Sequence, residues 1–477
     1  MREKYIFFIK NMSILTISNF VSKILVFLML PLYTNVLTTQ EYGTIDIIST
    51  TINLSIPIFT LSISEAILRY TMEKNVKKEE VLKESLKVIV KGFLILLVFS
   101  PITIFFKLPL IYVVIFLIYY LTTAIINALS YYTKGTNNLK LLGISNIIRA
   151  LLLVSLNCLM LLVLKLNIIG YYISLIVSDI IFILILLIPV LKNKQKRIKQ
   201  NNQLAKEMKS YSKPFIINSI SWWINNALDK YLVLFFCGIN LTGIYSIAYK
   251  IPSMLEVVQN IFAQAWQISA IKEYKSKEAN AFFSTMYKYY NFILIMTVLI
   301  ILLFLKPISK ILFAKEFYVA WKFVPFLLLA ILFGALSGFL GSLYSANKDS
   351  KMYAKSTLIG AISNIILNLI LIPIFNAYGA AIATFISYLV VWIIRVKNVK
   401  KYLELKIEHK KNTIIYLLLI IMCFANQLIS SNIIYVIDTI IIIITIFTYK
   451  DVIQNFINKL RSKWCNEKNR NNDLVFL

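Results

Sequence analysis

Ionisable side chains interrupt several long apolar runs of this chain, where they are costly unless they meet water, a ligand or an opposite charge. The basic residues at such positions, each able to attract an anion, are Lys23, Arg69, Arg149 and Lys250. The acidic residues there, which could pair with them or take up a cation such as a proton, are Glu65, Asp229 and Glu256. These residue types predict electrostatic recognition of an anionic ligand.

The depth of each charge within its apolar run indicates what it can reach. Lys23 lies about a dozen residues, or ~18 Å by helical rise, from either end of its run, which is far for the ammonium group to reach the interface. We expect Lys23 to line a wet cavity, the alternative being a pair with an acidic neighbour. Arg149, about two turns into its run, can reach the interface. Glu65 and Arg69 are four residues apart and could pair along one helix face.

The remaining charges have structural alternatives as well. Asp229 and Lys230 are adjacent and must point to different faces of a helix, so at least one should face the protein interior. Glu256 lies near the centre of its run, where a carboxyl group is disposed to protonation and hence to proton coupling. For Asp179 and Asp438 a structural role is the better interpretation.

No constellation of catalytic or metal-binding residues accompanies these charges. The single histidine, His409, lies in a basic stretch, which excludes a histidine-based triad. The cysteines Cys158, Cys237, Cys423 and Cys465 are scattered without metal-ligand spacing. No glycine-rich phosphate loop follows Gly135 or Gly143. The sequence therefore predicts that the protein is not an enzyme and needs no cofactor or metal.

The apolar runs themselves predict an all-α polytopic membrane protein. The chain is 59% hydrophobic with a mean hydropathy of +0.76, whereas soluble domains are roughly 45–50% apolar. A run of about 20 residues spans the hydrocarbon core as a helix, and we count about fourteen transmembrane helices. They are expected at residues 12–36, 43–70, 84–106, 109–132, 141–164, 167–191, 214–237, 243–269, 283–305, 323–346, 356–375, 378–396, 413–430 and 432–449.

Lysine and arginine fall almost entirely in alternate gaps between these runs, which predicts the orientation of the helices. The gap at 192–213 is rich in lysine, whereas the gaps at 38–42 and 238–242 contain no lysine or arginine. We expect both termini and the basic loops on the cytoplasmic side of the inner (cytoplasmic) membrane. The net charge of +28 then reports topology and contact with the phospholipid membrane, and no nucleic-acid partner is expected.

Internal similarity predicts two related halves. Residues 144–148 (ISNII) recur at 362–366, and Tyr42-Gly43-Thr44 opens one run much as Thr242-Gly243-Ile244 opens another. Repeats of this kind build the two lobes of many transporters. We expect two pseudo-symmetric six-helix lobes plus two C-terminal helices. The expected divisions are an N-terminal lobe at 1–191, a basic cytoplasmic linker at 192–213, a C-terminal lobe at 214–396, a basic loop with helices 13 and 14 at 397–449, and a cytoplasmic tail at 450–477.

The chain resembles the polysaccharide-export branch of the multidrug, oligosaccharidyl-lipid and polysaccharide exporter superfamily, which includes O-antigen and capsule repeat-unit flippases. The resemblance covers nearly the whole length. It rests on Ser22-Lys23 followed by Glu41-Tyr42-Gly43, on residues 225–230 (NNALDK), on residues 243–250 (GIYSIAYK) and on residues 378–384 (YGAAIAT). The stretch at 169–174 (IGYYIS) departs from the small-residue pattern of residues 378–384.

The resemblance implies alternating-access transport of a lipid-linked oligosaccharide repeat unit on undecaprenyl pyrophosphate, from the inner to the outer leaflet, for surface polysaccharide biosynthesis. A polysaccharide polymerase and glycosyltransferases would then be partners. Three alternatives remain open: a lipid II or sporulation-type flippase, a drug/cation antiporter, and a membrane-embedded glycan polymerase. The basic residues Lys23, Arg149 and Lys250 count against the antiporter, and the small size of the external gaps counts against the polymerase.

Overall fold

The computed structural model describes residues 20–73, 75–101, 109–192, 202–274, 276–347, 349–429 and 432–454. Within these ranges the chain folds into helices and contains no strand. Each of the fourteen predicted segments falls on helical chain, and residues 12–19, 102–106 and 430 of those segments lie outside the described ranges. The predicted tail beyond residue 454 and residues 193–201 of the linker lie outside them too.

The helices have the length and composition of membrane spans. Nine of them, counted over the described residues, are long and apolar enough to cross a bilayer, and α3 (Thr39–Phe59) with α4 (Ile63–Thr71) makes a tenth span bent by 60°. Two shorter apolar helices lie at Phe20–Val36, which contains α2 (Leu30–Val36), and at α18 (Ile433–Thr448). The fold class is therefore that of an all-α polytopic membrane protein.

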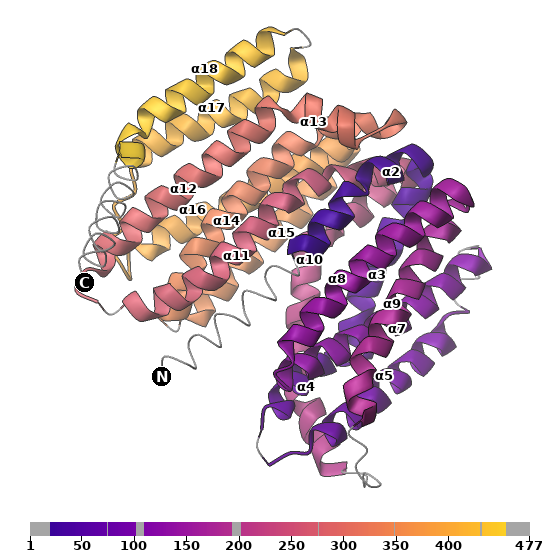
Figure 1. Ribbon diagram of the computed structural model, residues 1–477. Helices are drawn as coiled ribbons and strands as arrows, with labels where there is room; N and C mark the ends of the chain where they lie inside the picture. Colours follow the sequence, from indigo (N-terminus) through magenta and orange to yellow (C-terminus); the bar gives the residue numbers. More distant parts are fainter. Residues whose placement is uncertain are drawn as a thin grey trace, which may run out of the picture. The chain divides into compact units, whose positions relative to one another are not determined.

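The chain forms two compact units, and Figure 1 shows helices packed side by side within each. Unit 1 contains the described residues up to Ile247 together with Leu312–Tyr318. Its helices after α4 are α5 (Lys78–Phe99), α7 (Leu110–Gly135), α8 (Leu139–Asn157) continued by a π-helical stretch (Cys158–Val163), α9 (Asn167–Lys192) and α10 (Asn202–Ala248). Because α10 belongs almost wholly to unit 1, the boundary between the units comes at the end of α10. The two lobes inferred from the sequence repeat stay a prediction.

Local sequence signals explain where the helices of unit 1 begin and break. Thr38 and Glu41 form a reciprocal capping box at the start of α3, which supplies two backbone N–H groups with acceptors. The break between α3 and α4 follows Pro57 and contains Leu61 and Ser62 with positive φ. Gly238 interrupts α10 at φ 81° and ψ 173°, a conformation that is essentially restricted to glycine.

The first turns of α10 pack into the apolar core of unit 1. Leu204 and Met208 are buried in one cluster with residues of α4, α5, α7, α8 and α9. They are four residues apart and so lie on one face of the helix. Residues 202–213, which the sequence indicated only as a polar basic linker, are thus an amphipathic helix docked on unit 1.

Unit 2 comprises the described residues of Ala248–Ile311 and those from Val319 onward. Its helices are α11 (Lys250–Glu273), α12 (Ala279–Leu303), α13 (Leu305–Leu312, whose last residue belongs to unit 1), α14 (Val324–Ala346), α15 (Ser350–Phe375), α16 (Ala377–Val399), α17 (His409–Leu428) and α18. A 3₁₀ helix spans Lys315–Lys322. The helix α14 is the central one of unit 2, since 83% of its most apolar 18-residue stretch is buried, against 28% of the corresponding stretch of α15.

Exposed apolar stripes run along the outer helices of each unit. On α9 the stripe includes Ile180, Leu184 and Ile188, and on α18 it includes Val436, Ile440 and Phe447. Such contiguous apolar surface is unfavourable in water and is expected of helices that face lipid.

Candidate functional site

A polar network joins α3 to α10 inside unit 1. The Lys230 ammonium lies 2.9 Å from Oδ2 of Asp46, and the side chains of Lys230 and Asp46 are 15% and 14% exposed. The Ser246 hydroxyl donates a hydrogen bond of 2.8 Å to the same carboxylate oxygen. Both contacts join Asp46 on α3 to residues of α10.

A second carboxylate, Asp229, lies beside this network. It is buried and accepts hydrogen bonds from the Tyr245 hydroxyl at 2.8 Å and from the backbone N–H of Lys230 at 2.9 Å. Both members of the Asp229-Lys230 pair therefore make contacts in the protein interior. The Lys230 ammonium thus pairs with Asp46, while Asp229 is held by a hydroxyl and a backbone N–H group; ion coupling by Asp229 stays a prediction.

Two glycines bring the backbones of α3 and α10 into contact next to this network. A Cβ atom added to Gly243 would lie 2.0 Å from the carbonyl oxygen of Thr39, and one added to Gly43 would lie 2.4 Å from that of Ile239. Real Cβ atoms essentially never come so close. Glycine at both positions is thus required for α3 and α10 to approach as they do. Sequence reasoning noted these glycines as a repeat but did not identify Asp46 as a partner of Lys230.

Arg149 pairs with a buried carboxylate on a neighbouring helix. Its guanidinium lies 2.5 Å from Oδ1 of Asp179, whose side chain is 0% exposed, while the Arg149 side chain is 33% exposed. The hydroxyl of Thr122 donates a longer hydrogen bond of 3.4 Å to the other carboxylate oxygen. Arg149 on α8 and Asp179 on α9 thus neutralise each other, so the Arg149 charge is partly committed within unit 1.

Glu65 and Arg69 are not paired with each other, although their spacing allowed it. Arg69 pairs with Glu73 at 3.4 Å and its side chain is 63% exposed. Glu65 accepts a hydrogen bond of 3.2 Å from the Tyr131 hydroxyl on α7. The spacing of four residues was thus met by Glu73, which lies two residues past the end of α4.

The other predicted residues are less constrained. Lys23 is exposed on the helix Phe20–Val36 and makes no salt bridge with any residue that the structure describes. Lys250, the first residue of α11, is half-buried and likewise has no salt-bridge partner within the described ranges. Glu256 is exposed on the same helix. The structure therefore leaves Lys23 and Lys250 as cations able to meet an anion.

Unit 2 contains a buried arginine that the sequence did not single out as a candidate. Arg395 lies in the helix predicted at 378–396, which the structure extends as α16 to Val399, and the Arg395 side chain is buried. Arg395 donates hydrogen bonds to Ser356 and Thr357 on α15 and to the carbonyl of Ser337 on α14, and it lies over the ring of Tyr353 at 4.5 Å. These contacts tie three helices together, so its role is structural.

A network of partly exposed ion pairs lies in the same unit. The Lys288 ammonium on α12 contacts Glu408 at 2.6 Å and also pairs with Asp451, while Lys411 lies 2.9 Å from Glu408. The hydrogen bond from Lys288 lowers the pKa of the Glu408 carboxyl below its ordinary value.

Across the residues that the structure covers, no group of three or more histidine, cysteine, aspartate or glutamate side chains could hold a metal ion.

Comparisons with known proteins identify the family to which the chain belongs. Residues 8–267 match the family described as polysaccharide biosynthesis protein. The probable low-salt glycan biosynthesis flippase Agl15 of Haloferax volcanii is 25% identical over 215 residues, covering 43% of this chain and 44% of that protein. The uncharacterized membrane protein MJ1068 of Methanocaldococcus jannaschii is 24% identical over 291 residues, covering 56% of each chain. The chain thus spans about half the length of these curated relatives.

Solved structures share the fold over a longer span. The lipid II flippase MurJ in its inward closed conformation has a TM-score of 0.64 at 17% identity, covering 92% of this chain and 99% of MurJ. An inward-facing multidrug resistance transporter of the MATE family has a TM-score of 0.62 at 12% identity, covering 87% of this chain and 96% of the transporter. At such identities the similarity shows the fold alone.

Proposed function

The chain belongs to the polysaccharide biosynthesis protein family, and from this premise we propose that it is a flippase for undecaprenyl-pyrophosphate-linked oligosaccharide repeat units. It would move them from the inner to the outer leaflet of the cytoplasmic membrane by alternating access, with both termini cytoplasmic. A pyrophosphate and its sugars cannot cross hydrocarbon without a polar path. The glycosyltransferases that build the repeat unit and the polymerase that joins the units would be its partners.

The observation that carries the proposal is Lys23. It is an exposed lysine on an apolar helix, without a salt-bridge partner among the described residues, and such a cation is unfavourable in hydrocarbon unless it meets water or an anion. A phosphorylated substrate provides that anion. Lys250 is the second cation of this kind, whereas Arg149 and Arg69 already contact carboxylates and would assist more weakly.

The acidic residues are proposed to act in ion coupling. Asp229 lies within hydrogen-bond reach of Tyr245 and next to the Asp46–Lys230 pair, so a change in protonation there would be transmitted to the contact between α3 and α10. Glu256 and Glu65 are the further candidates for this role. The coupling proposal predicts that Asp229→Asn separates substrate binding from transport.

The test is a deletion strain. Loss of the gene should abolish surface glycan while lipid-linked repeat units accumulate on the cytoplasmic leaflet, and expression of the intact chain should restore both. Units that reach the outer leaflet and stay unpolymerised would instead identify a polymerase. Uptake or export of organic cations in reconstituted vesicles, without glycan transport, would identify an antiporter.

Lipid II is the second candidate substrate, one of the alternatives that the family resemblance leaves open. Growth of a strain depleted of its own lipid II flippase, on expression of this chain, would support that candidate. Failure to restore growth, together with restored surface glycan in the deletion strain, would support the repeat unit.

A further inference from the structure

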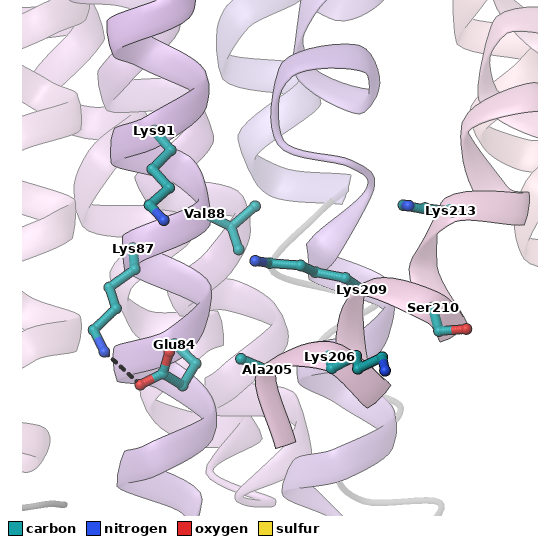
Figure 2. Close-up of a pocket in the computed structure, with 9 residues that line it drawn as sticks. All are labelled: Glu84, Lys87, Val88, Lys91, Ala205, Lys206, Lys209, Ser210 and Lys213. Carbon is teal, nitrogen blue, oxygen red and sulfur yellow. Dashed lines mark hydrogen bonds and ion pairs between the residues drawn. The ribbon is translucent and has the colours of Figure 1, made fainter. Parts of the chain in front are cut away.

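A cavity of about 450 Å³ opens in unit 1 between α5 and the first turns of α10. Figure 2 shows its lining, with Lys209 extended from α10 toward Val88 and the Lys91 amine on the other side of Val88. The side chains from α5 are spaced by three or four residues, as are most of those from α10, so each helix presents one face to the cavity. The lining residues are Glu84, Lys87, Val88 and Lys91 on α5, and Ala205, Lys206, Lys209, Ser210 and Lys213 on α10.

The lining is strongly cationic. It contains five lysines and one glutamate, a formal charge of +4. Glu84 is committed to Lys87 at 2.6 Å, and the other four lysines make no salt bridge with a residue in the described ranges. Residues 193–201, which precede α10, contain four further cations and no acid. The adjoining linker therefore cannot neutralise this cavity.

The same faces of both helices change from lysine to exposed apolar residues within one turn. On α5, Lys87 and Lys91 are followed at the same spacing by Ile95, which is 49% exposed. On α10, Lys209 and Lys213 are followed by Ile217, which is 73% exposed. Exposed apolar side chains on both helices mark the edge of the hydrocarbon. Lys91 and Lys213, the lysines nearest these apolar residues, thus lie about one turn, ~5.4 Å, outside it, at the depth of lipid headgroups, and the other lysines lie farther out.

We propose that this lysine cavity binds the phosphate group of a membrane lipid in the cytoplasmic leaflet. Lysine binds phosphate as a point charge, and lysine clusters at the membrane surface attract anionic headgroups. The acyl chains would lie along the exposed apolar faces that continue from Lys91 and Lys213. The bound phosphate would bridge α5 and the amphipathic start of α10, and so fix the segment that links the two halves of the chain. The lipid is either a bulk anionic phospholipid or a polyprenyl pyrophosphate; neither source requires that the chain transports glycan.

Lipid retention by the purified full chain tests this site. The protein is reconstituted in phosphatidylcholine nanodiscs, and phosphatidylglycerol or undecaprenyl pyrophosphate is added; bound lipid is counted by native mass spectrometry. The variant is Lys91→Gln with Lys209→Gln. Each lysine lost should weaken binding by about 5-fold, and the pair by roughly 25-fold. The pair Lys91→Arg with Lys209→Arg keeps the charge and should keep the lipid.

The control removes two exposed lysines that do not line the cavity, Lys140→Gln with Lys351→Gln. An equal loss of lipid in this control, or normal retention in the cavity variant, would overturn the site. Binding of inorganic pyrophosphate as tightly as of either lipid would contradict the membrane-lipid part of the proposal. The melting temperature in lipid-free detergent checks folding, because substitution at these solvent-accessible positions should leave it unchanged.

The two lipid arms identify the source of the phosphate. Retention of phosphatidylglycerol that is lost in the cavity variant identifies a structural phospholipid site. Retention of undecaprenyl pyrophosphate in preference to phosphatidylglycerol identifies an entry site for a polyprenyl carrier. Glycan transport is measured separately, so a failure of the proposed transport function leaves the lipid result intact.

Discussion

Ser246 donates a hydrogen bond of 2.8 Å to Asp46, and the two residues occupy matching positions in the repeat predicted from the sequence. Each lies three residues after a glycine, Gly43 or Gly243, and the two glycines also meet: a Cβ on Gly43 would lie 3.1 Å from the Gly243 nitrogen. The two backbones meet at these glycines, so the α3–α10 contact depends on both positions having no side chain.

The glycine contact predicts a severe effect of one methyl group. Gly243→Ala should lower the free energy of unfolding by about 1–3 kcal/mol, the usual cost of overpacking, since the added Cβ would lie 2.0 Å from the Thr39 carbonyl oxygen. The measurement is the melting temperature of the purified protein. The control is Gly338→Ala on α14, where an added Cβ meets nothing within 4 Å. That control should gain about 0.5–1 kcal/mol, because alanine favours the helix; equal effects of both variants would contradict the contact.

The Asp46–Lys230 pair predicts non-additive substitutions. Lys230→Met leaves Asp46 without its cation in a site that is 14% exposed, and removal of one member of a buried pair typically costs about 3–5 kcal/mol. Adding Asp46→Asn removes the uncompensated charge, so the double variant should be more stable than Lys230→Met alone. Thermal unfolding of the two single variants and the double variant gives the coupling. Strictly additive effects would show that the two side chains do not interact.

The helices could be predicted from the sequence, but the partners of their charges could not. A run of about 20 apolar residues is sufficient to indicate a span, and periodicity then identifies neighbours on the same helix only. Arg149 and Asp179 are on different helices, so neither residue's spacing pointed to the other. Asp46 was overlooked as a partner for Lys230 because 184 residues separate them.

Where the sequence did suggest a partner, the local geometry chose another. Glu65 and Arg69 have the spacing for a pair, yet Arg69 pairs with Glu73, which has the same spacing and lies just past the end of α4. The lysine cavity illustrates the same limit, since it forms only when 202–213 docks through Leu204 and Met208. The basic residues of this segment indicate topology only. The spacing of four residues between Leu204 and Met208 was the signal that would have predicted a docked helix.

The buried Arg395 predicts that charge alone is insufficient at its position. Arg395→Lys keeps the charge but cannot reproduce the fork of donors to Ser356, Thr357 and Ser337. Hydrogen bonds to charged groups contribute about 1.5–3 kcal/mol each, so loss of one should lower the melting temperature of the protein clearly. Lys397→Arg, on the same helix, is the matched control and should have little effect. A melting temperature unchanged by Arg395→Lys would exclude the three-helix clamp.

The Lys288–Glu408 contact predicts acid sensitivity. The folded pKa of Glu408 is lowered, first by the hydrogen bond from Lys288. Its contribution to stability is therefore present above the ordinary glutamate pKa of about 4.3 and is lost as pH falls through the lower folded value. The melting temperature, measured from neutral pH down to about pH 3, should therefore decrease as the pH drops below the ordinary glutamate pKa. Lys288→Met should lower stability at neutral pH and flatten the decline, and an unchanged pH profile would contradict the role of this contact.

Lys23 and Arg149 predict opposite outcomes for the same change of charge. Arg149→Gln should reduce the amount of folded protein in the membrane, because it leaves the fully buried Asp179 carboxylate uncompensated at a typical cost of about 3–5 kcal/mol. Lys23→Gln removes an exposed cation that has no ion pair with a described residue, so abundance should stay normal while glycan export is lost. Lys23→Arg should retain most of the export, since in the proposed function the charge of this residue, and not its shape, attracts the substrate phosphate.

Protein abundance and surface glycan, measured together in the deletion strain, separate these roles. A double variant, Arg149→Gln with Asp179→Asn, should recover part of the abundance because the buried charge is gone. Normal export in Lys23→Gln at normal abundance would remove Lys23 from the transport path, and Lys250→Gln would then be the next variant to test. Reduced abundance of Lys23→Gln would instead indicate that this lysine has a structural partner in the folded protein.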